Sequence, residues 1–417
     1  MAHNVTHRLH GAGPKRILAL DGGGTRGIIT IAFLEEIERL LAQRFVEQGR
    51  YRDPAEFRLA HYFDLIGGTS VGALIATQLA LGHAVADIRD RFRSWMPEIF
   101  KRRITGIKGV SDLYHARNLS DKIRSLVADE TMDSPLLKTG LAIVAKRADT
   151  GSVWVMTNNE RCKYWCREGD RTPNAKYKIH DVLRASSAAP TFFRPTEIEL
   201  FSGLDGNKPF TTTGTFIDGA VSPHNNPALQ LFKLARLKGY ALNWQTGPDN
   251  LLMISIGTGS HAAKVKRSRL LAREATDALV GMIGDSQQLV LAVMQWLSYP
   301  RDPWEIDREI GTQSEDLLTD EPMLSFQRYD MPLEYRWLSD TDPKMTGRRR
   351  GPKLKDALYE ARFKRTIADL QELIAPTTVP VLYDLATAAA QDQVMAVDFP
   401  ARFDDGICPE PAGEVSE

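Results

Sequence analysis

Two apolar runs, each followed by a glycine-rich turn and a helical pattern, constrain the fold of this chain most. Lys15–Leu20 leads into the turn DGGGTRG (Asp21–Gly27), after which apolar residues recur at helical spacing over Ile28–Phe45. The run Tyr62–Ile66 leads through small residues into a second helical pattern, Ala73–Leu81. Strands that alternate with helices predict an α/β fold in layers with a largely parallel central sheet.

The rest of the sequence continues this alternation and then becomes mainly helical. We expect a flexible arm over residues 1–14, one domain over 15–375 (core 15–260, helical extension 261–375), and a partly disordered tail over 376–417. Further strands are expected at Leu141–Ala145, at Val153–Met156, at a run ending with Phe216 and Ile217, and at Leu251–Ile256; helices are expected at Asp181–Ala188, Leu270–Leu297 and Leu354–Leu373, with a long loop at Asp302–Pro322.

Composition excludes several classes of protein. The 417 residues are 43% hydrophobic and 25% charged, as in ordinary globular proteins, and 53 basic residues balance 53 acidic ones, which does not favour a nucleic-acid partner. The first residues lack the apolar segment of a secretion signal, and no run reaches the roughly 18 apolar residues of a membrane span. Three cysteines, Cys162, Cys166 and Cys408, fit a reducing compartment. We therefore expect a cytoplasmic protein.

Ser70 is the candidate nucleophile. It stands in a G-x-S-x-G frame with Gly68 and Gly72, between the second apolar run and its helix. A sharp strand-to-helix turn through small residues is typical of a nucleophile elbow, in which the serine hydroxyl is exposed near a helix N-terminus. The elbow indicates a serine acyl hydrolase. The alternative interpretation is an ordinary strand–turn–helix with an incidental serine.

An acyl hydrolase also needs a base and donors for the oxyanion. The consecutive backbone N–H groups of Gly22, Gly23 and Gly24 suit an anion, and Arg26 lies in the same loop. Asp218, in FIDGA at the end of a strand, is the candidate base; such a carboxylate must be buried with a raised pKa. Among the histidines only His224 deserves consideration as a base, the alternative being a loop histidine.

The ordered blocks DGGGTRG, GTSVG and DGA resemble the patatin-like phospholipases. The resemblance covers about Lys15 to Ser260, including SSAAPTFFRP (Ser186–Pro195), DGAVSPHNNPAL (Asp218–Leu229) and ISIGTGS (Ile254–Ser260). It implies a three-layer α/β/α fold with additional C-terminal helices. It also implies a dyad of Ser70 and Asp218, an oxyanion hole at the Gly22–Gly24 turn that Arg26 supports, and hydrolysis of fatty acyl esters of phospholipids without a metal or cofactor.

The resemblance implies partners as well. The substrate is a phospholipid or another acyl ester, which a cytoplasmic enzyme meets by peripheral contact with a membrane; the segment Trp95–Val110 mixes aromatic, aliphatic and basic residues, as such a contact requires, although an ordinary connector is the alternative. Related bacterial proteins include antiphage effectors that cyclic nucleotides activate, so a cyclic nucleotide is a candidate activator.

Three other functions are compatible with parts of the pattern. An acyl-thioesterase or acyltransferase would use the same dyad and differ in leaving group or acceptor. A sugar kinase of the actin-like fold would use DGGGT for ATP phosphates and Gly257-Thr258-Gly259 near the adenosine. A binding or scaffold protein without catalysis would have no need of the serine, the aspartate and the glycine turn together.

Overall fold

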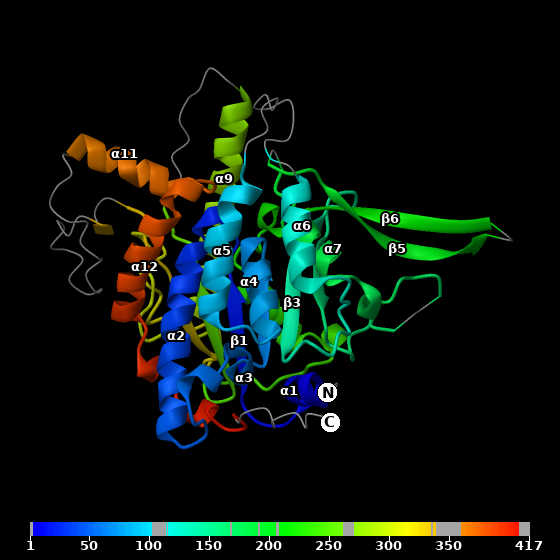
Figure 1. Cartoon of the computed structure of the whole chain (residues 1–417). Coiled ribbons are helices and arrows are strands. Elements are labelled where there is room, and N and C mark those ends of the chain that lie inside the picture. Colours follow the sequence, from blue (N-terminus) through cyan, green and yellow to red (C-terminus); the bar gives the residue numbers. More distant parts are fainter. Residues whose placement is uncertain are drawn as a thin grey trace.

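A mixed sheet of eight strands forms the middle of the molecule (Figure 1). The computed structural model describes residues 3–101, 114, 116–166, 169–190, 192–205, 208–261, 271–334, 337–338 and 360–407. The strands are β1 (Lys15–Leu20), β2 (Leu65–Thr69), β3 (Gly140–Arg147), β4 (Val153–Thr157), β5 (Thr196–Asp205), β6 (Lys208–Asp218), β7 (Leu251–Ile256) and β8 (Ser325–Tyr329).

The strand order is β5-β6-β3-β2-β1-β7-β8, and β4 pairs with β3. The neighbours from β3 through β2, β1 and β7 to β8 are all parallel, whereas β4, β5 and β6 pair in the antiparallel sense. The predicted, largely parallel sheet is confirmed. The carboxyl ends of β1 and β2 lie side by side, which brings the two glycine-rich turns to one edge of the sheet.

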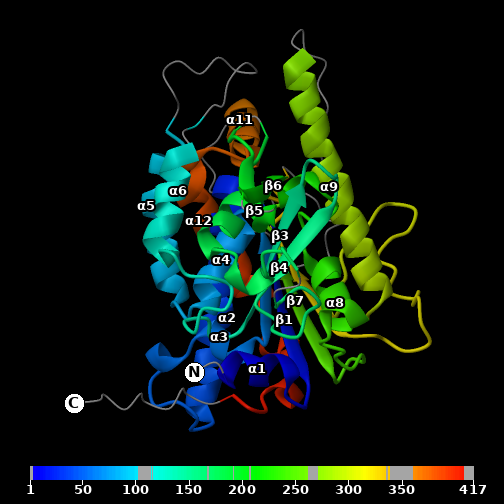
Figure 2. The ribbon, with the colours of Figure 1, turned by 90° about the vertical axis from the view of Figure 1, so that its right-hand side faces the viewer.

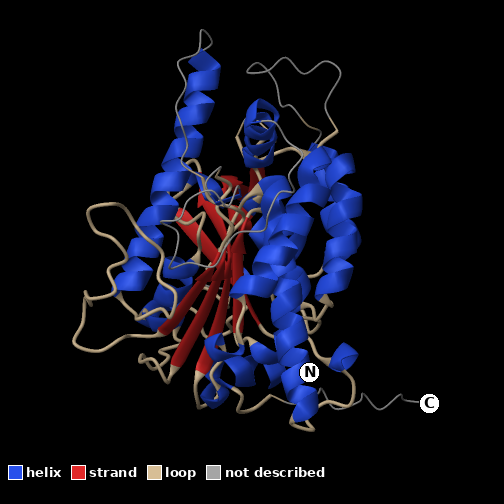
Figure 3. Ribbon diagram, turned by 90° about the vertical axis from the view of Figure 1, so that its left-hand side faces the viewer, coloured by secondary structure: helices blue, strands red, loops and turns tan. Residues whose placement is uncertain are grey.

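Helices cover both faces of the sheet, so the three-layer α/β/α arrangement is confirmed (Figure 3). One side holds α2, α4, α5, α6, α7 and α12, and the other holds α1, α8 and α9 (Figure 2). The helices are α1 (His3–His10), α2 (Gly27–Glu47), α3 (Leu59–Tyr62), α4 (Val71–Ala80), α5 (Val85–Ile99), α6 (Ala116–Val127), α7 (Ile179–Ser186), α8 (Ala228–Arg236), α9 (Leu271–Trp296), α11 (Glu360–Gln371) and α12 (Val379–Gln393).

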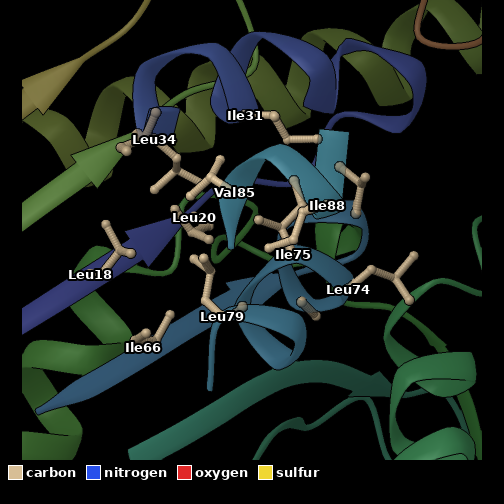
Figure 4. Packing of buried hydrophobic residues seen from close by; sticks show 14 of the residues in the cluster. Leu18, Leu20, Ile31, Leu34, Ile66, Leu74, Ile75, Leu79, Val85 and Ile88 are labelled. Atoms are coloured by element: carbon tan, nitrogen blue, oxygen red, sulfur yellow. The ribbon is translucent and has the colours of Figure 1, made fainter. Parts of the chain in front are cut away.

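The last four residues of the central strand β1, Ile17–Leu20, are all apolar because both faces of the strand are buried. Leu18 and Leu20 belong to the core under α2 and α4, while Ile17 and Ala19 belong to the core on the opposite face. Figure 4 shows Leu18 and Leu20 among side chains of α2, α4 and α5. This packing fixes the position of the turn that follows Leu20.

Two predicted segments differ from the structure near the N-terminus. The predicted arm over residues 1–14 contains helix α1. Its Leu9 is 1% exposed and belongs to the core on the sheet face that α8 and α9 cover. The predicted strand Tyr62–Ile66 is wrong at its start: residues Leu59–Tyr62 are helical and the strand begins at Leu65. Tyr62 and Phe63 are fully buried, so their apolar character reflected the core rather than a strand.

The tail predicted over residues 376–417 as partly disordered is folded over its described part. Helix α12 packs in the same core as α2, and its Leu382 and Ala386 are fully buried. The chain then continues to Phe399 and Phe403, which are buried as well. Residues 408–417 lie outside the described residues. Residues 376–407 are therefore part of the folded layers.

The long hairpin of β5 and β6 projects from one edge of the sheet (Figure 1). Only the end of β6 was predicted. Helix α9 confirms the predicted helix at Leu270–Leu297, and α11 lies within the predicted Leu354–Leu373. Among the described residues, a helix that could cross a bilayer is not found.

Candidate active site

The turn between β2 and α4 holds Ser70 in an unusual backbone conformation. Its φ is +54° and its ψ is −123°, values that cost energy for any residue with a side chain. A Cβ at position 68 would lie 2.2 Å from the carbonyl carbon of Gly72, and one at position 72 would lie 2.3 Å from the Leu20 carbonyl oxygen. Glycine is therefore required at both positions, and the predicted elbow geometry is present.

Asp218 meets this serine from the end of β6. The Ser70 hydroxyl donates a hydrogen bond to Asp218 Oδ2 at 2.6 Å, and the Ala220 N–H donates to Asp218 Oδ1 at 2.8 Å. The pairing of Asp218 with Ala145 of β3 sets this position, because β3 is the next strand to β2. The structure thus brings together the two residues expected to form a dyad.

The carboxyl group of Asp218 is removed from solvent. The residue is 2% exposed, and burial raises its pKa from 3.8 to about 6. The hydrogen bonds from Ser70 and Ala220 and the positive charge of Arg184 oppose this rise. The prediction that Asp218 is buried with a raised pKa is confirmed, and this pKa suits a base that works near neutral pH.

The turn after β1 lies directly against Ser70. A Cβ at position 22 would lie 3.3 Å from Ser70 Cβ. The Gly22 N–H donates to the Asn225 carbonyl oxygen at 3.1 Å, so this group is already used. Over the described ranges, the N–H groups of Gly23 and Gly24 have no hydrogen-bond acceptor. Of the three predicted glycines, Gly23 and Gly24 therefore keep donors available.

Arg26 supports the turn from a buried position. Its Nη1 donates to the Gln371 carbonyl oxygen at 3.3 Å and lies 3.2 Å from Nδ1 of His261. Burial lowers the pKa of Arg26 to about 10, and burial together with Arg26 lowers the pKa of His261 to about 4. A neutral His261 can accept the hydrogen bond that the guanidinium donates.

His224 does not join the dyad. Its backbone carbonyl accepts a hydrogen bond from Thr69 Oγ1 at 2.7 Å, but its Nδ1 has no partner in the described part of the chain. Burial lowers the pKa of this imidazole to about 4. The partners of the Asp218 carboxylate are Ser70 and Ala220. The structure therefore favours the alternative interpretation of His224 as a loop histidine.

Ser186 is a site residue whose role the sequence did not reveal. Its Oγ accepts a hydrogen bond from the Ser70 N–H at 2.9 Å and donates one to the Val144 carbonyl oxygen at 2.6 Å. The side chain thus fixes the backbone of Ser70 to strand β3. Ser186 stands in the block SSAAPTFFRP, which resembles the family. Nothing in that block indicates a contact with Ser70, 116 positions earlier.

A buried ion network supports the first residue of the glycine turn. The guanidinium of Arg328 donates to both carboxylate oxygens of Asp21, at 3.0 and 2.7 Å, and Gln287 of α9 donates to Asp21 as well. Arg328 also contacts Asp330 at 3.2 Å. Burial raises the pKa of Asp21, while the two bonds from Arg328 favour its charged form. The network ties β1, β8 and α9 together beneath the turn.

A cavity of about 730 Å³ contains Ser70, Asp218 and the glycine turn. Its walls differ in character. One wall is apolar and comes from α4, α5, α6 and the segment after α7: Leu74, Met96, Ile99, Leu119, Phe192 and Phe193. The other side is mixed: the polar residues Arg26, His261, Gln287, Gln288, Asp330 and Glu334 lie among the apolar residues Met282, Ile283, Leu291, Ile306 and Ile374. A molecule with an apolar chain and a polar end fits this division.

The segment Trp95–Val110 was predicted to contact a membrane. Residues 102–113 lie outside the described residues. In the described part, Met96 and Ile99 are 4% and 1% exposed and face the cavity rather than solvent. These apolar side chains therefore belong to the wall of the site.

Comparisons with known proteins place this geometry in context. The family model described as "Patatin-like phospholipase" matches residues 18–232. A cGAMP-activated phospholipase of Vibrio cholerae is 28% identical over 292 residues, which cover 67% of this chain and 73% of that protein. Patatin-like protein 1 of Arabidopsis thaliana is 32% identical over 60% of each chain. A cUMP-AMP-activated phospholipase of Escherichia coli is 30% identical over 45% of this chain and 51% of that protein.

Proposed function

Because this chain belongs to the patatin-like phospholipase family, we propose that it hydrolyses fatty acyl esters of phospholipids with Ser70 as nucleophile and Asp218 as base. The observation that carries the proposal is the 2.6 Å hydrogen bond from the Ser70 hydroxyl to a buried carboxylate, inside the cavity. Membership of this family excludes the alternative of an actin-like sugar kinase with Gly257–Gly259 near adenosine.

The proposed reaction has two halves. Asp218 takes the Ser70 proton as Oγ attacks the ester carbonyl, and the lysolipid leaves with that proton, so that an acyl-serine remains. Asp218 then takes a proton from water, which attacks the acyl-serine; the fatty acid is released and the proton returns to Ser70. The N–H groups of Gly23 and Gly24 stabilise the oxyanion in both halves, and Arg26 holds their loop.

The two walls of the cavity support the choice of substrate. A fatty acyl chain lies along the apolar wall of Leu74, Ile99 and Phe193, while the glycerophosphate end lies toward Arg26 and His261. This orientation places the ester between the walls, where Ser70 stands. A phospholipid is taken from a membrane, so we also propose peripheral contact of the protein with a membrane surface.

Activation by a cyclic nucleotide is part of the proposal. It rests on relatives whose names describe phospholipases activated by cGAMP or cUMP-AMP, one of which matches 67% of this chain. An enzyme that degrades membrane lipids needs such control, and an effector role in antiphage defence would follow from it.

A fluorophosphonate probe tests the dyad directly. Labelling is expected at Ser70, with fatty acid released from phospholipid vesicles in the presence of cGAMP or cUMP-AMP, and Ser70→Ala should abolish both. Ser187→Ala is the matched control, because this serine lines the same cavity and its hydroxyl has no hydrogen-bond partner in the described structure; it should still be labelled.

Three outcomes would change the conclusion. Labelling that persists in Ser70→Ala would overturn the assignment of the nucleophile. Acyl transfer to an added alcohol or thiol without free fatty acid would favour an acyltransferase. A folded protein that neither reacts with the probe nor hydrolyses lipid under any of these conditions would favour the binding or scaffold function.

A further inference from the structure

A second cavity lies between α6, α7 and the start of β5. Its volume is about 290 Å³, and its lining differs from that of the catalytic cavity in being basic. Arg124 comes from α6, Arg184 from α7, and Arg194 from the segment just before β5. We call it the α6–α7 cavity.

Positive charge dominates this lining. Three arginines face one carboxylate, Asp181, and that carboxylate already lies 2.9 Å from Nδ1 of His180. Arg184 is 7% exposed, and its Nη2 donates a hydrogen bond to the Arg194 carbonyl oxygen at 2.8 Å. This bond connects α7 to the segment just before β5. A concave surface lined mainly by one sign of charge attracts counter-ions of the opposite sign.

The donors in the lining are of the types that bind phosphate. Guanidinium groups present planar pairs of N–H donors that match phosphate oxygens. The hydroxyls of Ser120 and Thr196 add neutral donors to the lining. The volume of about 290 Å³ is just below the range for drug-sized ligands, about 300–1,000 Å³. It suits a phosphate with a few attached atoms.

We propose that the α6–α7 cavity binds the phosphate group of a small anionic ligand, separately from the catalytic cavity. The shared chemistry has two sources: the headgroup of an anionic membrane lipid that is not being hydrolysed, or a free phosphate compound in solution. A whole cyclic dinucleotide exceeds this volume, so the site is distinct from the one for the proposed activator.

The cavity is coupled to the catalytic site through α7. Its residues His180, Asp181 and Arg184 line the cavity, and the helix ends at Ser186, whose Oγ accepts the hydrogen bond from the Ser70 N–H. The Arg184 guanidinium lies 5.5 Å from the ring centre of Phe193, a residue of the apolar wall. A phosphate on Arg184 would therefore change contacts next to the dyad; this coupling, unlike the binding itself, rests on the proposed function.

Binding is tested with inorganic phosphate and glycerol 3-phosphate by isothermal titration calorimetry. The variant Arg124→Gln/Arg194→Gln removes two exposed side chains and should weaken binding at least about tenfold, the usual effect of losing charge-assisted hydrogen bonds. Arg117→Gln is the matched control, since Arg117 is exposed on the same helix but does not line the cavity. Ser70→Ala should bind as the wild type does.

Vesicles distinguish the two sources. Stronger binding to vesicles of phosphatidylcholine with phosphatidylglycerol than to phosphatidylcholine alone, lost in the double variant only, identifies a lipid headgroup. Binding of the soluble probes without this vesicle preference identifies a free phosphate. Equal binding by the wild type and the double variant, or binding of neither class of probe, overturns the proposal. Lost hydrolysis with intact phosphate binding would instead count only against the proposed dyad.

Discussion

The acidity of one buried carboxyl group controls the proposed chemistry. Asp218 must be ionised to accept the Ser70 proton, and burial raises its pKa to about 6. We predict that kcat/KM for a soluble ester rises about tenfold per pH unit up to about pH 6 and is constant above it. The measurement is a pH–rate profile between pH 4 and 9 on protein whose fold is followed by circular dichroism.

Asp218→Asn is the variant that tests this assignment. It should lower kcat/KM by about 10²–10⁴ and abolish the inflection near pH 6, because an amide cannot accept the proton. An inflection that survives in this variant would assign the titration to another group. Retained activity would overturn the role of Asp218 as base.

Ser186 acts on the nucleophile through the backbone. Ser186→Ala leaves the Ser70 N–H and the Val144 carbonyl oxygen without their partner, so we predict a loss of about 1–3 kcal/mol in the free energy of unfolding and a lower kcat with KM little changed. Ser187→Ala controls for stability, because no hydrogen bond of its hydroxyl is lost. Denaturant unfolding and steady-state kinetics measure both; equal stability of the two variants would contradict the prediction.

Residues differ in how well the sequence reveals them. Ser70 and Asp218 stand in short local patterns, since a tight turn needs its glycines within a few positions. The anchors Ser186 and Asn225 contact the turns from positions more than 100 residues away, and nothing in their own neighbourhood marks that contact. The hydrogen bond from the Gly22 N–H to the Asn225 carbonyl oxygen is also a contact between distant residues. The sequence therefore predicts oxyanion donors at three glycines, whereas in the described structure two of them have an available N–H.

At the scale of elements, the glycine turn is held by the segment that follows α11. The Thr25 N–H donates to the Leu373 carbonyl oxygen at 2.9 Å, its Oγ1 donates to the same oxygen at 3.1 Å, and it accepts from the Ala375 N–H at 3.0 Å. The Arg26 guanidinium bonds the preceding Gln371 carbonyl oxygen. The proposed oxyanion donors therefore depend on a segment about 350 positions later in the chain.

Thr25→Val tests this dependence. It removes the two side-chain bonds with little change in shape, so we predict that kcat falls about tenfold or more, because small displacements of oxyanion donors are costly. Thr139→Val is the matched control: this buried threonine also bonds a distant carbonyl oxygen, that of Phe63, but away from the site. Both variants should lose about 1 kcal/mol of stability, and only Thr25→Val should lose kcat. Equal kcat values would show that the turn is rigid without this anchor.

Elements were predictable where burial follows a simple period. Strand β1 is recognisable by its continuous apolar run, because both of its faces are buried, and helix α2 by apolar residues at helical spacing, because it packs on one face of the sheet. The hairpin of β5 and β6 was largely missed since most of its outer half is exposed and threonine-rich, with no alternation to detect. The alanine-rich sequence of α12 has too weak an apolar periodicity to predict a packed helix. Its buried face is evident only once α2 lies against it.

For the molecule as a whole, the chain end closes the fold that the chain start begins. Arg16 of β1 forms two bonds of 2.9 Å with the Asp64 carboxylate and one of 2.8 Å with the Phe403 carbonyl oxygen. Asp398 accepts hydrogen bonds from Arg301 and from the Tyr329 hydroxyl. The C-terminal segment thus contacts the central strand, β8 and the region after α9, so we expect the patatin-like core and its extension to unfold together.

We predict that a chain ending at Ala375 does not fold. It loses Leu382, Leu385, Phe399 and Phe403, all buried, and each such side chain contributes roughly 1.5–3 kcal/mol. Their sum, roughly 6–12 kcal/mol, equals most of the roughly 5–15 kcal/mol that stabilises a typical protein. A chain ending at Ile407 is the control and should show the melting temperature of the full chain. Circular dichroism and size-exclusion chromatography decide the matter: a monodisperse, cooperatively melting protein ending at Ala375 would show that α12 is an accessory to the fold.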